Sequence, residues 1–304
     1  MSNFKFPPAV TGLECLHQGK VRDTFAIPGH PDLLLTVATD RVSTHNVVHH
    51  SEVPKKGYAL TALTVFWMSE HLPGVKTHLI AFGNGIFKYL PKGDYPDDLL
   101  LRALVIRRLN MIPVEFIFRS RMAGSLWKDY YQKDLPNPYG HNLPSGLQLM
   151  SPFEHTIFTP TDKSETDDPL PASAVIWEHH EAYELARRAY EIGREFANAC
   201  CIDIIDGKFE VGFDSRGQVV LADECLTPDS CRFVRGRSLV VGEDPPWLDK
   251  QYLREEAERI WTGGKKTPIT FSPSVLRETT VRYEDIVDEL TGASLMTFQA
   301  TRFR

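Results

Sequence analysis

Cysteines are few in this sequence, and none is spaced as a metal-binding or disulfide framework would require. The 304 residues contain five cysteines, and no Cys-x-x-Cys pair occurs among them. Neither a zinc ribbon nor a disulfide-stapled fold is therefore indicated. We expect the thiols to be reduced, as is usual for a cytoplasmic protein.

Long hydrophobic runs and an excess of basic charge are also missing. No apolar stretch approaches the roughly 18 residues that a membrane-spanning helix needs, and residues 1–8 lack the apolar stretch of a signal peptide. The formal net charge is −6, so the chain has no general basic field for nucleic acid. We expect neither a membrane nor a nucleic-acid partner, although a local cluster of Arg and Lys could still bind a small anion.

Several common nucleotide and hydrolase motifs are absent. There is no GxxxxGK[S/T] sequence and no GxGxxG after a strand, which argues against a P-loop and a Rossmann dinucleotide site. HExxH and GxSxG are also absent, which argues against a zincin protease and an α/β-hydrolase. If a nucleotide binds, another arrangement must hold its phosphates.

The hydrophobic pattern groups strands and helices separately. Strands are predicted at 33–38, 103–109, 114–118, 209–213 and 218–223. Helices are predicted at 54–71, 174–201, 248–261 and 274–290. The apolar stripe predicted for the second helix is Ala182, Leu185, Ala189, Ile192, Phe196 and Cys200. Residues 136–171, rich in Pro, Asn, Gly, Ser and Asp, are predicted to form a long loop. This grouping indicates an α+β fold.

The most informative stretch is 203–213 (DIIDGKFEVGF). Alternate residues of a strand share a face, so three apolar side chains would oppose three ionisable ones: Phe209, Val211 and Phe213 against Asp206, Lys208 and Glu210. The predicted hairpin returns Asp223 to the neighbourhood of Lys208. Glu210 and Asp223 could then share a Mg²⁺ ion with nucleotide phosphates, while Lys208 neutralises a phosphate or carboxylate. The alternative is a surface ladder of salt bridges.

Other polar clusters suit anionic ligands. Asp229 and Arg232 follow the second strand of the hairpin, and Arg can bind a phosphate or carboxylate with two parallel hydrogen bonds. Arg119 and Ser125 flank the end of another strand, where small residues leave backbone N–H groups accessible. The alternatives are a plain turn and a solvated strand end.

Two further clusters lie in the first half of the chain. Lys20 and Arg22 follow a glycine turn and could cover ATP phosphates, or could simply be exposed. Asp40, Arg41 and Ser43 follow a predicted strand, where polar side chains suit the rim of a site. A turn or helix cap would explain the second cluster equally well.

Taken together, these segments resemble the SAICAR synthetase family. The motifs occur in family order at 19–23 (GKVRD), 39–43 (TDRVS), 54–57 (PKKG), 113–119 (PVEFIFR), 123–125 (AGS), 158–160 (FTP), 205–212 (IDGKFEVG), 221–224 (LADE), 226–230 (LTPDS) and 248–252 (LDKQY). The resemblance implies an ATP-grasp-like α+β fold with a nucleotide cleft. A smaller β-rich lobe (1–112) would cover ATP, and a larger α+β lobe (113–304) would hold the metal and the other substrates.

The resemblance also implies an activity and roles for single residues. The reaction would join L-aspartate to the carboxylate of carboxyaminoimidazole ribonucleotide (CAIR), giving SAICAR, ADP and phosphate, in a cytoplasmic monomer or homodimer. Lys208, Glu210 and Asp223 would be catalytic, with Mg²⁺ on Glu210 and Asp223. The residues near ATP would be Lys20, Arg22, Met111, Glu115, Lys208 and Glu210. The residues near the other substrates would be Asp40, Arg41, Ser43, Arg119, Ser125, Asp206, Lys208, Asp229 and Arg232.

Two departures from the family pattern leave alternatives open. Lys163 and Glu165 remain from a family motif, but 166–171 (TDDPLP) replaces its usual continuation. The sequence 44–46 (THN) stands where the family tends to have Asp. A diverged enzyme that uses ATP to activate a carboxylate for another amine is therefore one alternative. A non-catalytic nucleotide-binding protein is the second, although the retained Lys208, Glu210 and Asp223 argue against it.

Overall fold

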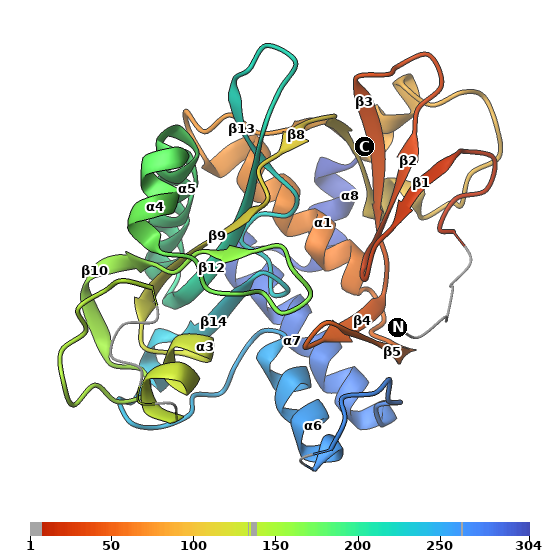
Figure 1. The fold of residues 1–304 in the computed structure, drawn as a ribbon. Helices are drawn as coiled ribbons and strands as arrows, with labels where there is room; N and C mark the ends of the chain where they lie inside the picture. The colour runs from red at the N-terminus through yellow and green to blue at the C-terminus, as the bar shows by residue number, and fades with distance from the viewer. Residues whose placement is uncertain (1–7, 133, 135–138, 263) are drawn as a thin grey trace. The chain divides into compact units, whose positions relative to one another are not determined.

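The protein is described by a computed structural model covering residues 8–132, 134, 139–262 and 264–304 (Figure 1). The chain forms two compact units, and each contains residues distant in sequence. The first unit holds the residues up to Ser69 together with His78–Arg108 and Asp249–Arg304, and the second holds Glu70–Thr77 and Leu109–Leu248. The predicted division after residue 112 lies close to the change of unit after Arg108, while residues 249–304 group with the first unit.

The first unit contains a five-stranded antiparallel sheet in the order β1-β2-β3-β7-β6 and a separate β4–β5 hairpin. Its strands are β1 Cys15–Gln18, β2 Arg22–Ala26, β3 Leu33–Ala38, β4 Arg41–Thr44, β5 Val47–Glu52, β6 Leu79–Phe82 and β7 Ala103–Arg107. The structure confirms the predicted strand 33–38 as β3. Phe25, Leu35, Val37 and Val105 are fully buried on this sheet.

The helices of the first unit come from both ends of the chain. They are α1 Lys56–Phe66, η2 Gly83–Lys88, α2 Leu99–Arg102, α6 Gln251–Trp261, α7 Pro273–Thr291 and α8 Leu295–Arg302, with the π-helical turn η1 Trp67–His71 continuing α1. Local sequence explains the ends of α7. The Ser272 side chain accepts a hydrogen bond from the backbone N–H of Val275, Pro273 starts the helix, and Gly292 ends it at φ 70°, a left-handed conformation that glycine adopts readily.

The second unit is built on a seven-stranded antiparallel sheet with the path β10-β9-β12-β13. Its strands are β8 Asn110–Met111, β9 Val114–Arg121, β10 Pro152–Phe158, β11 Thr161–Asp162, β12 Ile202–Phe213, β13 Val219–Ala222 and β14 Cys231–Arg235. Its helices are α3 Gly124–Trp127, η3 Lys128–Gln132, α4 Ala172–Glu178, α5 His180–Ala199 and η4 Gly236–Ser238. Strand β12 pairs with β9, β13, β14 and β8, so it forms the centre of this unit.

Helix α5 covers one face of the β9–β12 sheet through aromatic contacts. Phe118 of β9 stacks on Tyr190 with ring centroids 5.9 Å apart, and the Tyr190 hydroxyl donates to the carbonyl of Ile204 at 2.9 Å. In the predicted stripe, Ala182 and Ala189 are buried, whereas Leu185, Ile192, Phe196 and Cys200 are half-buried. The fully packed face is Ala182, Ala186, Ala189, Tyr190, Gly193 and Ala197. Small residues and a satisfied tyrosine fit closely against the sheet, whereas larger side chains such as Leu185 and Ile192 are only half-buried.

The predicted long loop at 136–171 contains two strands, β10 and β11, and its other described residues lie outside helices and strands. Residues 136–138 lie outside the described residues. Strands β10 and β11 both pair with β9 inside this segment. Most of β10 is exposed or half-buried, so its sequence lacks a hydrophobic pattern, and pairing with β9 stabilises it instead. In the part of the chain that the structure describes, no helix is long and apolar enough to span a bilayer.

Candidate functional site

Strands β12 and β13 bring the two candidate metal ligands, Glu210 and Asp223, close to Lys208. Glu210 pairs with Ala222 across the ladder, and Asp223 follows Ala222 directly, where it turns out of the strand at φ 56°. Burial disfavours the ammonium form of Lys208, but three neighbouring carboxylates outweigh it and raise the pKa of that lysine. These carboxylates belong to Glu115, Glu210 and Asp223. Asp223 therefore lies close enough to act on Lys208 electrostatically, as the hairpin predicted.

Alternating charges continue from β12 onto the neighbouring strands. The ammonium of Lys208 donates to Oε1 of Glu115 at 2.8 Å and lies 3.4 Å from Oε1 of Glu210. The other oxygen of Glu210 pairs with Nζ of Lys163, and the other oxygen of Glu115 accepts from the Thr161 hydroxyl at 3.0 Å. These four charged side chains are 16–31% exposed, so their charges are only partly screened by water.

A second cluster on β12 joins two arginines to one carboxylate. Oδ2 of Asp206 accepts from Nη1 of Arg119 at 2.5 Å and from Nη1 of Arg232 at 2.6 Å. The side chains of Asp206 and Arg119 are 6% and 3% exposed, and that of Arg232 is 15% exposed. Guanidinium groups bind a carboxylate or phosphate well through paired hydrogen bonds, and Arg232 is the more exposed of the two arginines.

The backbone around this cluster is shaped to admit Arg232. Gly124 has φ +59°, and a Cβ atom at this position would lie 2.6 Å from Nη1 of Arg232. Arg119 is fixed from the other side, since its Nη2 donates to the Ser125 hydroxyl at 3.0 Å and its Nε to Oγ1 of Thr159 at 2.9 Å. The predicted residues Arg119, Ser125, Asp206 and Arg232 are therefore in one cluster.

Asp229 lies in the turn that leads to Arg232. Its backbone N–H contacts Oγ1 of Thr227 at 3.3 Å, and the Thr227 hydroxyl donates to the buried carboxylate of Glu224 at 2.5 Å. This turn is held by its own polar side chains, and it places Asp229, which is half-buried, two residues before β14.

In the first unit, the 39–43 segment has contacts within that unit. Nη2 of Arg41 donates to Oδ1 of the buried Asp23 at 2.5 Å and to the carbonyl of Gly19 at 3.0 Å. Oδ1 of Asp40 accepts from the backbone N–H of Gly57 at the start of α1, at 2.9 Å. Ser43 is a buried residue of β4. These contacts give Asp40 and Arg41 a structural role, whatever ligand they also contact.

The glycine turn before β2 carries the predicted phosphate-binding residues. Nζ of Lys20 donates to Oδ1 of Asn46 in the β4–β5 turn at 2.5 Å, and Arg22 opens β2 opposite Ala38. Asn46 is one of the positions that depart from the family pattern. Its side-chain amide is neutral, so this hydrogen bond does not neutralise the charge of Lys20.

Met111 and Glu115 lie in the second unit on strands that adjoin β12. Met111 of β8 pairs with Gly212 and is 38% exposed, while the carboxylate of Glu115 is bonded to Lys208 and Thr161. A thioether open to solvent suits contact with an adenine ring. The carboxylate of Glu115 is also part of the charge network of Lys208.

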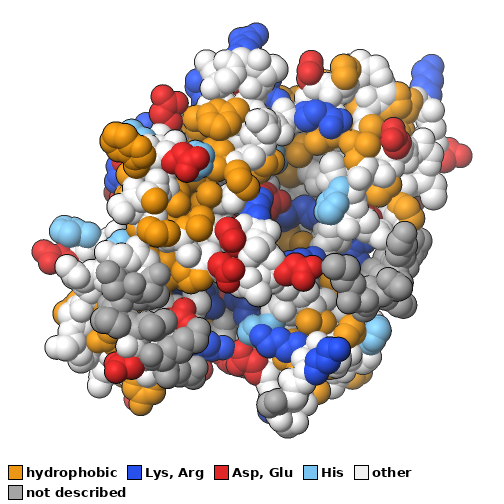
Figure 2. Space-filling view, viewed as in Figure 1, with side chains coloured by type: hydrophobic (Ala, Val, Ile, Leu, Met, Phe, Trp, Pro, Cys, Tyr) orange, Lys and Arg blue, Asp and Glu red, His pale blue; other side chains and the backbone are white. Residues whose placement is uncertain are grey.

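The charges of this region are local features of a mixed surface. Figure 2 shows basic and acidic side chains interspersed over the face in view. Within the described residues, no three His, Cys, Asp or Glu side chains gather as a complete metal cage. Two carboxylates such as Glu210 and Asp223 fit Mg²⁺ that arrives with a nucleotide, because Mg²⁺ typically takes one or two carboxylates and completes its shell with phosphates and water.

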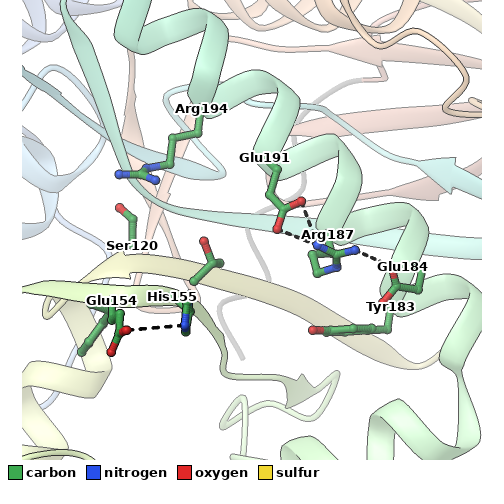
Figure 3. A pocket seen from close by; sticks show the side chains of 10 residues that line it. Ser120, Glu154, His155, Tyr183, Glu184, Arg187, Glu191 and Arg194 are labelled. Carbon is green, nitrogen blue, oxygen red and sulfur yellow. Dashed lines mark hydrogen bonds and ion pairs between the residues drawn. The ribbon is translucent and has the colours of Figure 1, made fainter.

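A hollow of about 610 Å³ lies between α5 and β10 (Figure 3). It is lined by Ser120, the strand neighbour of Arg119, so it opens on the face of β9 opposite to the arginine cluster. Arg187 points along this hollow but is held by Glu191 at 2.7 Å and Glu184 at 2.6 Å. Its charge is already balanced, and the hollow takes no part in the cluster around Asp206.

Two residues that contact predicted site residues were not themselves predicted to belong to the site. Lys163 reaches Glu210, and Thr159 fixes Arg119. Both lie in segments that the family resemblance had marked, 158–160 and 163–165. Their pattern alone gave no signal because the whole segment was expected to be a loop.

Comparison with known proteins agrees with the motifs. A family model described as SAICAR synthetase matches residues 15–269. Phosphoribosylaminoimidazole-succinocarboxamide synthase of Thermobifida fusca is 37% identical, covering 94% of both chains. The enzyme of that name from Saccharomyces cerevisiae is 35% identical, covering 92% of this chain and 95% of its own. The solved SAICAR synthase of S. cerevisiae complexed with SAICAR has a TM-score of 0.83 at 32% identity, covering 95% of this chain and 98% of its own. The chain belongs to the SAICAR synthetase family.

Proposed function

We propose that this chain is an ATP-dependent ligase that joins L-aspartate to the carboxylate of CAIR, forming SAICAR, ADP and phosphate. The observation that carries the proposal is the order of groups along one face of β12. Asp206, with its two arginines, is followed by Lys208 and then Glu210. Alternate residues of a strand are about 7 Å apart, so an anion-binding cluster lies beside a lysine and a candidate metal ligand.

The chemistry requires an activated carboxylate. An oxygen of the CAIR carboxylate attacks the γ-phosphorus of ATP and ADP leaves, which gives an acyl phosphate. The amine of aspartate then attacks the acyl carbon, loses a proton and displaces phosphate. Both steps concentrate negative charge, and cationic groups that hold phosphates in line stabilise such transition states.

Different residues would bind the ribonucleotide, the transferred phosphate and the metal. Arg119 and Arg232 would bind anionic groups of the ribonucleotide, because guanidinium groups form paired hydrogen bonds with phosphate or carboxylate. Lys208 is held in its charged form by its carboxylate neighbours, and its ammonium would face the transferred phosphate. Glu210 and Asp223 would hold Mg²⁺, which supplies charge neutralisation to the phosphates of the nucleotide when bound.

The remaining residues are assigned to the ATP phosphates, the adenine, the ribonucleotide and a substrate-binding rim. We assign Lys20 and Arg22 to the ATP phosphates, and Met111 and Glu115 to the surroundings of the adenine. Ser125 and Asp229 would assist the ribonucleotide beside the arginine cluster. Asp40, Arg41 and Ser43 would support a substrate-binding rim. We place the enzyme in the cytoplasm, which is consistent with its free cysteines.

The direct test is ADP release with purified protein and Mg²⁺, omitting one substrate at a time. We expect release to require ATP, CAIR and L-aspartate together. Glutamate, asparagine and ammonia serve as alternative amines in parallel reactions. Turnover with one of these and none with aspartate would replace the proposal with a diverged ligase, and nucleotide binding without any product would indicate a non-catalytic protein.

A further inference from the structure

A lysine that the proposed mechanism does not use contacts the carboxylate assigned to the metal. Lys163 pairs through Nζ with Oε2 of Glu210, while Oε1 of that carboxylate lies 3.4 Å from Nζ of Lys208. Both oxygens of Glu210 therefore face an ammonium group. A divalent cation that binds Glu210 must approach two positive charges.

The loop that carries Lys163 is closed by its own hydrogen bonds. Oδ1 of Asp162 accepts from the backbone N–H groups of Ser164 and Asp168, both at 3.0 Å, and the N–H of Asp162 donates to the carbonyl of Asp168. Thr161 and Pro169 form a bridge at its base. Because β11 anchors this loop to β9, Lys163 is presented to Glu210 from a fixed position.

The charge of Lys163 acts in opposite directions on two forms of the same metal. It repels a bare divalent cation at Glu210 and Asp223, since like charges a few ångströms apart disfavour each other. It attracts a metal that arrives with a nucleotide, because the phosphates then accept the ammonium. A lysine in this position therefore discriminates between the bare ion and the metal–nucleotide complex.

We propose that Lys163 is a positioning residue that keeps the Glu210–Asp223 pair from binding a bare divalent cation, so that the metal enters with the nucleotide. This inference rests on the proposed metal role of Glu210. It adds a selectivity determinant in the 163–165 segment to the residues assigned above.

The test measures Mn²⁺ binding by electron paramagnetic resonance, with and without ADP, in the full-length protein. We expect Lys163→Met to tighten the binding of Mn²⁺ alone by about three- to tenfold, a modest effect because the pair is partly exposed. Binding of Mn²⁺ with ADP should be unchanged or weaker. Lys163→Arg keeps the charge and should behave as wild type. Lys76→Met is the matched control, since Nζ of Lys76 donates to the neutral side chain of Gln218 at 3.1 Å.

The outcomes separate this inference from the proposed function. If Glu210→Gln weakens binding of Mn²⁺ with ADP but Lys163→Met leaves binding of Mn²⁺ alone unchanged or weaker, the role of Lys163 is refuted and the metal site stands. If Glu210→Gln leaves binding of Mn²⁺ with ADP unchanged, the metal assignment fails and the inference fails with it.

Discussion

At the scale of single residues, two arginines share one carboxylate oxygen on β12. Asp206 accepts hydrogen bonds from both Arg119 and Arg232, and all three side chains are largely withdrawn from water. Taking charges out of water costs free energy, and the attraction between them offsets this cost only in part. The arginine cluster is therefore weak evidence for stability, which is consistent with the binding role proposed for it.

Removing one arginine should weaken the ribonucleotide. We expect Arg232→Ala to raise the KM for CAIR by about tenfold or more, because a charge-assisted hydrogen bond contributes about 1.5–3 kcal/mol, with a smaller effect on the KM for ATP. Steady-state kinetics with each substrate varied would measure both. Arg216→Ala, in the exposed turn of the β12–β13 hairpin, is the control, and an unchanged KM for CAIR in Arg232→Ala would contradict this role.

A methyl group beside Arg232 should have a related effect without removing a charge. In Gly124→Ala the new Cβ would lie 2.6–2.8 Å from the guanidinium group, so Arg232 must move and the KM for CAIR should rise severalfold. Gly146→Ala has a comparable positive φ, +80°, but meets nothing within 4 Å. Both variants carry the backbone strain, so equal CAIR kinetics in the two would show that the position of Arg232 is unimportant.

His49 should make the first unit sensitive to acid. Burial, followed by the charges of Lys250, His50 and His45, lowers the pKa of His49 to about 4. Nδ1 accepts from the backbone N–H of Ile269 at 3.3 Å, so the neutral ring donates from Nε2 to Thr44 at 2.8 Å. The folded state therefore favours the neutral ring.

This pKa fixes the direction of the pH dependence. The unfolded state takes up the proton near pH 6.5 and the folded state only near pH 4, so stability falls as pH drops through this window. Between pH 7 and pH 5 the expected loss from His49 is about 2 kcal/mol. Urea unfolding at both pH values should show this difference between wild type and His49→Gln. Equal pH dependence in the two proteins would contradict the burial argument.

At the scale of elements, the contact between α5 and the segment after β13 depends on one glycine. A Cβ on Gly193 would lie 2.1 Å from Cδ1 of Leu226, and Leu226 is completely buried. Gly193→Ala should destabilise the protein by about 1–3 kcal/mol through overpacking, despite a gain of about 1 kcal/mol in helix propensity. Asn198→Ala, exposed on the same helix, should stay within about 0.5 kcal/mol of wild type. A Gly193→Ala protein as stable as wild type in urea would show that Leu226 can move.

Helix α5 also shows where sequence patterns were sufficient and where they were not. Its existence followed from periodicity, but its packed face did not, because Gly193 and Tyr190 were not counted as core residues. Periodicity ranks side chains by hydrophobicity, whereas the sheet selects them by size and by a partner for the Tyr190 hydroxyl. Strand β10 was missed for a related reason, since pairing with β9 rather than an apolar face holds it in place.

The candidate site was predictable where strand alternation determined it. Asp206, Lys208 and Glu210 share a face because of their spacing, and the hairpin turn brought Asp223 to them. The pairing of Asp206 with both Arg119 and Arg232 required knowledge of the strand neighbours, because these residues are 87 and 26 positions away in sequence. The contact between Lys163 and Glu210 depends on the conformation of a loop, which no sequence pattern predicts.

At the scale of the whole molecule, the chain is divided so that both of its ends contribute to one unit. The carbonyl of Phe303 accepts from the backbone N–H of Asn84, and Gln299 donates to the carbonyl of Leu101 at 2.8 Å. Residues 249–304 thereby complete the unit that carries Lys20 and Arg22, while β12 and its partners carry the carboxylates and arginines.

The most direct test compares the rate of aspartate-dependent ADP formation in wild type, Glu210→Gln and Asp223→Asn, at saturating substrates and Mg²⁺. Both substitutions keep size and hydrogen-bonding capacity, and near-ultraviolet circular dichroism would verify an unchanged fold. Each should reduce the rate by about a hundredfold or more, the order of loss when a group that stabilises transition-state charge is removed. Rates near that of wild type in both variants would contradict the claim that β12 and β13 hold the metal–nucleotide complex.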